Sequence, residues 1–421
     1  MTCTATALHG LQARAPAKQI STMHHSDYCE SIDRSTARHS TDAGAATSAG
    51  DPKILSEPKH DAGPWLAFDS LRYPMAVLVV IIHYNLLVFK HIPYGQVELS
   101  IRHCATWAQM ALSYVACIAA DVAVPTFFLI SGYLVFYRVE RFDRATYTAK
   151  LRRRAQSLLV PYLVWNLIAY FALHSSYSLK SLLLSFSFFP LGVYGLNHPA
   201  DLPLWFVRDL MALSLASPLV WAAVKRWGCA LPLAALAFWW VGRGPIWVIG
   251  FSSVAVCFYA IGAWAAIGRH SVTSWAARPQ VLAAAAAVWV VASVADLATF
   301  HYVERAVGFG KLNIDWLHHT AILAGVALAL GLASRAAHGS RRTLTSPLAR
   351  HSFMVFALHI VLLPHLMKAV GRLAGLVAPY SAPMLLAMSA TMVLLAVLLC
   401  TAASALVARV PLLPRLLTGG R

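Results

Sequence analysis

Charged residues are scarce in this sequence. Of its 421 residues only 12% are Asp, Glu, Lys or Arg, whereas 59% are hydrophobic, and the mean hydropathy is +0.62. A soluble domain of this length needs a charged exterior, which this composition cannot supply. The scarcity therefore argues against an ordinary soluble protein and predicts an all-α, polytopic helix bundle in a membrane.

Acidic residues and paired cysteines are also few. There are 17 Asp and Glu against 34 Lys and Arg, which gives a formal net charge of +17. Most of the basic residues lie between apolar runs, which weakens a nucleic-acid function. The seven cysteines are scattered and form no C-x-x-C pair, so we expect neither a structural disulfide nor a metal site.

Ten apolar runs are present, and most are long enough to cross the hydrocarbon core of a bilayer, which takes about 20 helical residues. They lie near 66–89, 108–137, 156–173, 203–224, 229–242, 246–267, 280–298, 316–334, 352–371 and 383–408. The third and fifth are short, so their edges and the count itself stay open by one. We predict a transmembrane domain over 63–412, preceded by a disordered cytoplasmic tail (1–62) and followed by a cytoplasmic tail (413–421).

Basic residues predict the orientation of these spans. With the N-terminus inside, the segments between spans on the cytoplasmic side hold eighteen Lys or Arg, whereas the opposite side holds eight. The positive-inside rule thus favours ten spans with both termini in the cytoplasm of a cell with a plasma (inner) membrane. Two irregular features are expected: a kink or break at Pro125, and a re-entrant or merely interfacial segment over 175–201.

Arg72 and His83 lie within the first apolar run. They are eleven residues apart, so at 100° per residue they return to within about 20° of one helix face, roughly 16 Å apart along the axis. Snorkelling to the headgroups accounts for Arg72 alone, and a hydrogen-bonded core histidine is the plainer interpretation of His83. The functional alternative is that His83 lines a polar path as a general base.

Several motifs give the chain a family resemblance. The stretch "RYPMAVLVVIIH" is an R-x10-H motif, followed in order by "FFLISGY", "KLRRRAQSLLVPY", "LWFVRDLMAL" and "SFMVFALHIVL". Together these segments resemble the acyltransferase-3 family of integral membrane O-acyltransferases, over most of 66–365. The resemblance implies transfer of an acyl group, often acetyl, from cytoplasmic acyl-CoA to a hydroxyl of a carbohydrate or another envelope molecule. It implies no permanently bound cofactor.

Roles for individual residues follow from this resemblance. Arg152, Arg153 and Arg154 would form an electropositive mouth for the phosphates of acyl-CoA, although a purely topological role is as well supported. Arg72 would grip a pyrophosphate or pantetheine oxygen. His83 would either deprotonate the acceptor hydroxyl or carry the acyl group itself, and the sequence does not decide between these.

Further candidates would bind substrate. Asp121 would orient the imidazole of His83, neutralise Arg208, or cap the helix before Pro125. Ser131 in "ISGY" would contribute to the substrate site or permit close helix packing. The remaining candidates are intramembrane or interfacial polar and aromatic residues with equally plain packing roles: Trp205, Arg208 and His359.

A competing hypothesis is a transporter or exporter of an envelope precursor. It would also use many helices, buried Arg and His side chains, and a broken helix. No inverted repeat is visible, and the motifs favour the enzyme. The acceptor, the acyl chain length and the oligomeric state are left open.

Overall fold

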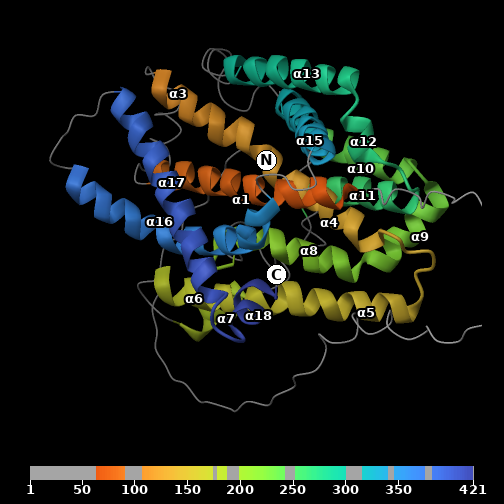
Figure 1. Cartoon of the computed structure of the whole chain (residues 1–421), viewed down its shortest axis with the longest axis horizontal. Coiled ribbons are helices and arrows are strands. Elements are labelled where there is room, and N and C mark those ends of the chain that lie inside the picture. The colour runs from red at the N-terminus through yellow and green to blue at the C-terminus, as the bar shows by residue number, and fades with distance from the viewer. Residues whose placement is uncertain are drawn as a thin grey trace, which may run out of the picture.

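The protein is described here from a computed structural model. The structure describes residues 63–90, 107–173, 178–186, 199–241, 252–299, 315–339, 346–374 and 382–420. Within these ranges all regular secondary structure is helical (Figure 1), which confirms the predicted all-α class. The predicted N-terminal tail and most of the predicted re-entrant segment lie outside the described residues.

The helices of the first half of the chain end with the bent pair α8 and α9. In order they are α1 (Gly63–Lys90), α3 (Trp107–Tyr114), η1 (Val115–Ala119), η2 (Ala120–Val122), α4 (Ala123–Phe136), α5 (Arg144–Arg154), η3 (Ala155–Leu159), α6 (Val160–Leu173), α7 (Leu179–Ser185), η4 (Leu202–Leu204), α8 (Trp205–Leu215) and α9 (Ser217–Trp227).

Among the described residues, the second half continues with α-helices and the 3₁₀ helix η6. These are α10 (Ala230–Trp240), α11 (Ser253–Ile267), α12 (Val272–Ala276), α13 (Pro279–Ala298), α15 (Asp315–Gly339), η6 (Ser346–His351), α16 (Ser352–Ala374), α17 (Ala382–Val407) and α18 (Leu413–Thr418).

Each of the ten predicted apolar runs corresponds to helix in the described chain. Seven helical stretches are long and apolar enough to cross a membrane, and α8 with α9 make an eighth, bent by 64°. The other two, α10 and α11, are apolar but only 11 and 15 residues long. The protein is therefore multi-pass, while the count of ten spans stays a prediction.

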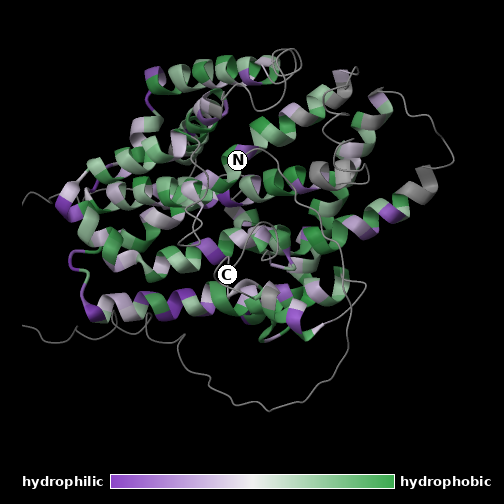
Figure 2. Cartoon of the chain, turned by 180° about the vertical axis from the view of Figure 1, so that it is seen from behind, coloured by the Kyte–Doolittle hydropathy of each residue, from purple (hydrophilic) through white to green (hydrophobic). Residues whose placement is uncertain are grey.

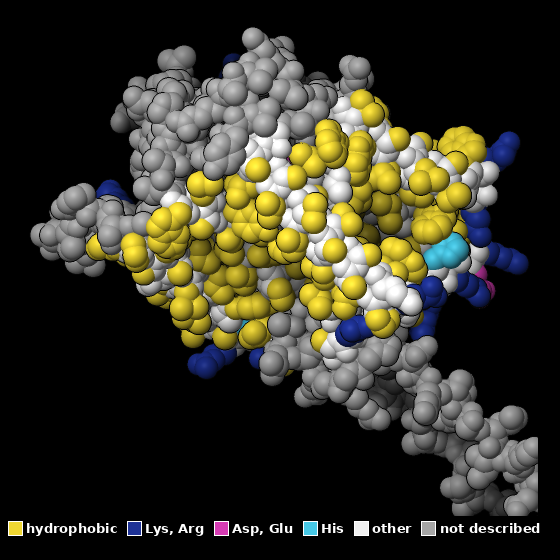
Figure 3. All heavy atoms as spheres, turned by 90° about the horizontal axis from the view of Figure 1, so that it is seen from above, with side chains coloured by type: hydrophobic (Ala, Val, Ile, Leu, Met, Phe, Trp, Pro, Cys, Tyr) yellow, Lys and Arg dark blue, Asp and Glu magenta, His cyan; other side chains and the backbone are white. Residues whose placement is uncertain are grey.

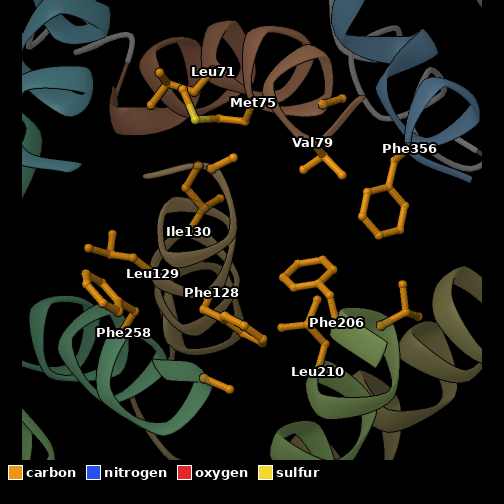
Figure 4. Close-up of a cluster of buried hydrophobic side chains, with 14 of the residues drawn as sticks. Leu71, Met75, Val79, Phe128, Leu129, Ile130, Phe206, Leu210, Phe258 and Phe356 are labelled. Carbon is orange, nitrogen blue, oxygen red and sulfur yellow. The ribbon is translucent and has the colours of Figure 1, made fainter. Parts of the chain in front are cut away.

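Side chains of α1 point into the core of the bundle. Leu71, Met75 and Val79 recur every fourth residue, so they lie on one face of the helix. Each is at most 6% exposed, and Figure 4 shows Leu71 and Met75 above Ile130 of α4, with Val79 directed toward Phe206 and Phe356. Helix α1 packs against α4, α15, α16 and α17. This central position makes α1 the element that brings its own polar residues next to several other helices.

The crossing of α4 and α11 depends on glycine. A Cβ atom at Gly132 would collide with the backbone of Tyr259, and one at Gly262 would collide with the backbone of Leu129. Because the obstacles are backbone atoms, they cannot rotate out of the way. The glycine in "ISGY" therefore serves close helix packing, one of the roles that the sequence predicts for this motif.

The second predicted span is interrupted before Pro125 rather than at it. Helix α3 passes into the π-helical segment η1 and the 3₁₀ segment η2, and Pro125 lies in the first turn of α4. A proline ring excludes a regular α-helical hydrogen bond to the preceding turn and crowds its carbonyl group. The irregular segment therefore lies ahead of the proline, in η1 and η2, and it includes Asp121.

Arg152, Arg153 and Arg154 form the last turn of helix α5. Asp143 begins this helix by accepting a hydrogen bond from the backbone N–H of Thr146 at 2.8 Å, which holds the pKa of its carboxyl below the usual range. Helices α5, η3 and α6 then form one helical stretch over Arg144–Leu173. The arginines therefore have fixed directions around a helix axis.

Charge is distributed unevenly along the bundle. Helix α5, at the lower right of Figure 1 and the lower left of Figure 2, carries the most hydrophilic surface of the long helices. Figure 3 shows hydrophobic side chains across the middle of one face, with Lys and Arg gathered mainly at its right edge. An apolar belt with basic residues concentrated at one end is the arrangement that the charge bias of the sequence predicts.

The end of the described chain packs against the bundle. Helix α18, which belongs to the predicted C-terminal tail, contacts α6, η3 and α16. The indole N–H of Trp165 donates to the carbonyl oxygen of Leu417 at 2.8 Å. Gly419 follows with a positive φ of 70° and lies so close to Ser157 that a Cβ atom would collide with its backbone.

Candidate active site

Two buried imidazoles face each other between α1 and α16. The ring centroids of His83 and His359 are 5.0 Å apart, with an angle of 62° between the ring planes. This is an edge-to-face contact, so no side chain lies between the rings. His83 is 7% exposed and His359 is 0% exposed. The structure therefore joins two histidines that the sequence presents 276 positions apart.

Each ring is held by its own helix. Nδ1 of His83 lies 2.8 Å from the carbonyl oxygen of Val79, and Nδ1 of His359 lies 2.9 Å from that of Val355. Both contacts reach back one turn, so each imidazole is aligned with its helix. Nε2 of His359 is buried and has no hydrogen-bond partner. A buried imidazole nitrogen without a partner is costly in a structural role and available for chemistry.

Arg72, at the other end of the predicted motif, is only partly buried. Its side chain is 33% exposed and forms an ion pair with Asp69 at 3.1 Å, one turn earlier on α1. Arg154 of α5 lies close enough to Arg72 for an electrostatic interaction. The structure thus places one of the three predicted phosphate-binding arginines beside the arginine of the R-x10-H motif.

The three arginines of α5 have different surroundings. Arg152 and Arg153 are exposed, whereas Arg154 is partly buried and donates to the carbonyl oxygen of Ser131 at 3.4 Å. Within the described chain Arg154 has no carboxylate partner. Two neighbouring guanidinium groups repel each other unless an anion lies between them or near them. Arg154 and Arg72 therefore form a candidate anion site.

Two hydroxyl groups border this site, and sequence reasoning missed one of them. The Oγ of Ser131 and the hydroxyl of Tyr259 are both buried without a hydrogen-bond partner. Tyr259 lies within electrostatic range of Arg154. It sits inside an apolar run with no motif around it, and only the glycine crossing of α4 and α11 brings it next to Ser131.

Asp121 makes neither of the two side-chain contacts considered for it. Its carboxylate lies 3.1 Å from Nε2 of His318, whose Nδ1 lies 3.0 Å from Asp296. Both ring nitrogens face carboxylates, so hydrogen bonds on both sides require the imidazole to be doubly protonated or one carboxylate to be protonated. Asp121 therefore links α13 and α15 to η2 and does not orient His83.

Arg208 pairs with its own neighbour. Its guanidinium donates to Oδ1 of Asp209 at 3.2 and 3.1 Å, and the other oxygen of this fully buried carboxylate accepts the backbone N–H of Ser252 at 3.1 Å. This satisfied network stabilises the start of α8 against α11. Arg208, which the sequence predicts to bind substrate, is thus held in an ion pair with Asp209.

The carboxylate of Asp201, just before η4 and α8, is buried without a hydrogen-bond partner. Asp201 is 0% exposed, and neither carboxylate oxygen has a hydrogen-bond partner. Its backbone is fixed by the side chain of buried Asn166, whose Oδ1 accepts the N–H groups of Ala200 at 2.6 Å and Asp201 at 3.4 Å. The amide of Asn166 donates in turn to Ser185. Sequence reasoning missed Asp201 and Asn166, because neither stands in a recognisable motif.

Aromatic rings connect α8 to both sides of the candidate site. Trp205 packs on Phe128 with ring centroids 6.2 Å apart, and Phe206 packs on Phe356 at 5.7 Å. Phe356 is one turn before His359 on α16, so the apolar contacts in Figure 4 lie next to the imidazole pair. Trp205 contributes to this packing, and its predicted role toward substrate stays a prediction.

The arrangement defines a class of protein. A multi-pass helix bundle holds two buried imidazoles between α1 and α16. A cluster of cationic and hydroxyl groups is contributed by α1, α4, α5 and α11. Imidazoles with a free nitrogen suit proton or group transfer, and guanidinium groups suit an anionic substrate. Among the described residues no group of His, Cys, Asp and Glu could hold a metal ion. These features are those of a membrane-embedded transferase.

Comparison with known proteins names the family. The family model described as an acyltransferase domain matches residues 65–409, and the chain belongs to this acyltransferase-3 family. A curated relative, the succinoglycan biosynthesis protein ExoH of Rhizobium meliloti, is 32% identical over 130 residues. That match covers 28% of this chain and 34% of the relative, about a third of its length. No solved structure matches the chain.

Proposed function

We propose that the protein transfers an acyl group, in particular acetyl, from acyl-CoA on the cytoplasmic side to a hydroxyl of an envelope polysaccharide. Family membership supports acyl transfer, and the relative named for succinoglycan biosynthesis supports a polysaccharide acceptor. The concentration of Lys and Arg at one end of the bundle supports placing that end, with both termini, in the cytoplasm of an inner-membrane protein. A transporter is disfavoured by the same family membership.

The observation that carries the proposal is that α1 connects the arginine cluster, at Arg72, with the imidazole pair, at His83. Arg72 and Arg154 supply cationic groups for the phosphates of the donor, and Ser131 and Tyr259 supply unpaired hydroxyls for its polar arm. His83 lies eleven residues along the same helix, about 16 Å away by helical rise. An extended pantetheine arm bound by the arginines would bring its thioester toward the imidazole.

Acyl transfer to a hydroxyl needs a base. The acceptor oxygen attacks the thioester carbonyl carbon and forms the new C–O bond, while its proton passes to Nε2 of His83. The C–S bond then breaks, and the CoA thiolate leaves and takes the proton from His83. Arg152 and Arg153, which are exposed, contribute long-range attraction for the donor and the topological signal. Trp205, Arg208 and Asp121 are left outside this sequence of events.

The test uses purified protein in nanodiscs with labelled acetyl-CoA and a polysaccharide extract. Native protein should move label to the polysaccharide, and His83→Asn should lower kcat roughly 10²- to 10⁴-fold, to a residual rate that can still be measured. The asparagine amide can still donate to the carbonyl oxygen of Val79, so the helix turn is preserved while the base is lost. His365→Asn is the matched control, because exposed His365 makes the same contact to Val361 at 2.9 Å. Full transfer by His83→Asn would contradict the assignment.

A further inference from the structure

The contact between His83 and His359 determines which nitrogens are basic. A carbonyl oxygen can only accept a hydrogen bond, so Nδ1 of each ring, facing Val79 or Val355, must carry its hydrogen. The lone pair of each neutral ring is then on Nε2. Both imidazoles are consequently held in the same tautomer, with their basic nitrogens on the side away from their own helices.

No carboxylate among the described residues is placed to balance a positive charge on His83. Within the part of the chain that the structure describes, neither imidazole forms a hydrogen bond or an ion pair with a carboxylate: each Nδ1 contacts a backbone carbonyl oxygen of its own helix. When His83 accepts a proton it becomes a cation inside the bundle, without a carboxylate to balance it. An isolated buried charge is unfavourable unless a neighbouring group stabilises it. The ring of His359, in edge-to-face contact and with an unpartnered Nε2, is the neighbour placed to do so.

We propose that His83 and His359 act as a pair, in which the neutral ring of His359 stabilises the protonated state of His83 during acyl transfer. The inference rests on the proposed function. In the transfer step the acceptor proton moves from oxygen to His83 Nε2, and the neutral ring of His359, in edge-to-face contact, stabilises the resulting cation electrostatically. The proton then leaves with the CoA thiolate as the C–S bond breaks, so His83 returns to neutral. His359 acts through His83 and need not touch either substrate.

Steric order in the site supports this division of labour. His83 retains some exposed surface, whereas His359 has none. A thioester or acceptor hydroxyl can therefore approach His83 first, with His359 behind it. The two rings also belong to helices that pack directly on each other, so their separation is determined by backbone packing and not by flexible loops.

Asparagine at position 359 isolates the role of the second ring. The amide of His359→Asn can keep the hydrogen bond to the carbonyl oxygen of Val355 but has no basic nitrogen in place of Nε2. In the labelled acetyl-CoA assay we expect kcat to fall roughly 10- to 100-fold, as when a group supporting a reactive imidazole is removed. The KM for acetyl-CoA should change less than about twofold, because the donor phosphates bind elsewhere. His365→Asn on the same helix should leave both constants unchanged.

A double variant separates electrostatic support of His83 by His359 from a packing role. If the rings act as a pair, His83→Asn with His359→Asn should be no slower than His83→Asn alone, because the second ring has nothing left to support. Independent structural effects would instead multiply. His359→Gln and thermal unfolding of each variant serve as checks on folding.

The outcomes distinguish this inference from the proposed function. If kcat of both His359→Asn and His359→Gln lies within twofold of the native value, electrostatic support of His83 by His359 is overturned, while acyl transfer is left intact. So would a double variant slowed by the product of the two single effects. Absence of transfer by the native protein would refute the proposed function and, with it, this inference.

Discussion

Removing the charge of Arg154 tests the donor site most directly. Its guanidinium is partly buried beside Arg72 and lacks a carboxylate partner within the described chain. A charge-assisted hydrogen bond to a phosphate contributes about 1.5–3 kcal/mol, so Arg154→Gln should raise the Kd for acyl-CoA roughly 10- to 150-fold. Its only hydrogen bond within the described residues, to Ser131 at 3.4 Å, is long, and the substitution removes the repulsion with Arg72. The variant should therefore fold normally.

The same helix offers matched controls for this variant. Arg152→Gln and Arg153→Gln each remove one positive charge from α5 and alter the topological signal equally. Both side chains are exposed, and an exposed ion pair contributes at most about 1 kcal/mol, so each Kd should rise less than about fivefold. Binding is measured by titration calorimetry in nanodiscs, without acceptor. Equal weakening by all three variants, or none by Arg154→Gln, would show that the Arg154–Arg72 cluster is not the phosphate site.

Two further substitutions test other parts of the structure. Gly262→Ala should lower the free energy of unfolding by about 1–3 kcal/mol, because the new methyl group meets the backbone of Leu129 and Tyr133, and thermal unfolding in detergent would measure this. Asp201→Asn should raise the unfolding temperature, with a gain of roughly 1 kcal/mol at neutral pH, because it replaces an unpartnered carboxylate by a neutral amide of the same size. Burial raises the pKa of Asp201, so native protein binds the proton more tightly than unfolded protein and loses stability as pH rises. Asp201→Asn should abolish this loss, and an unchanged slope of stability against pH would contradict the reasoning.

The fold was predictable to the extent that it depends on local composition. Apolar runs of spanning length require helix in a bilayer, where backbone groups cannot be left without partners, and each predicted run is helical where described. The irregularity near Pro125 was also foreseeable, although not its position. The bend between α8 and α9 was missed, although Pro218 inside the fourth apolar run is a residue that interrupts a helix as Pro125 does.

The candidate site was predictable only where its residues are close in sequence. Arg72 and His83 share a helix, so their spacing alone suggests a common role. The partners of each come from elsewhere: His359 from α16, and Arg154 from α5. A run of three arginines gives no sign of which one turns inward, because that depends on the rotation of α5 against α4. Tyr259 has no polar neighbour in sequence at all.

The contact between α18 and α6 can form only late in the synthesis of the protein. The indole of Trp165 finds its hydrogen-bond partner in Leu417, 252 residues later. At about 5–20 residues per second, the ribosome needs roughly 10 to 50 s to make the intervening chain. Throughout that time α6 is without the contact with α18 that covers its start. Completion of this part of the bundle therefore waits until α18 has been made, and a stop codon before residue 413 would leave the start of α6 without this contact.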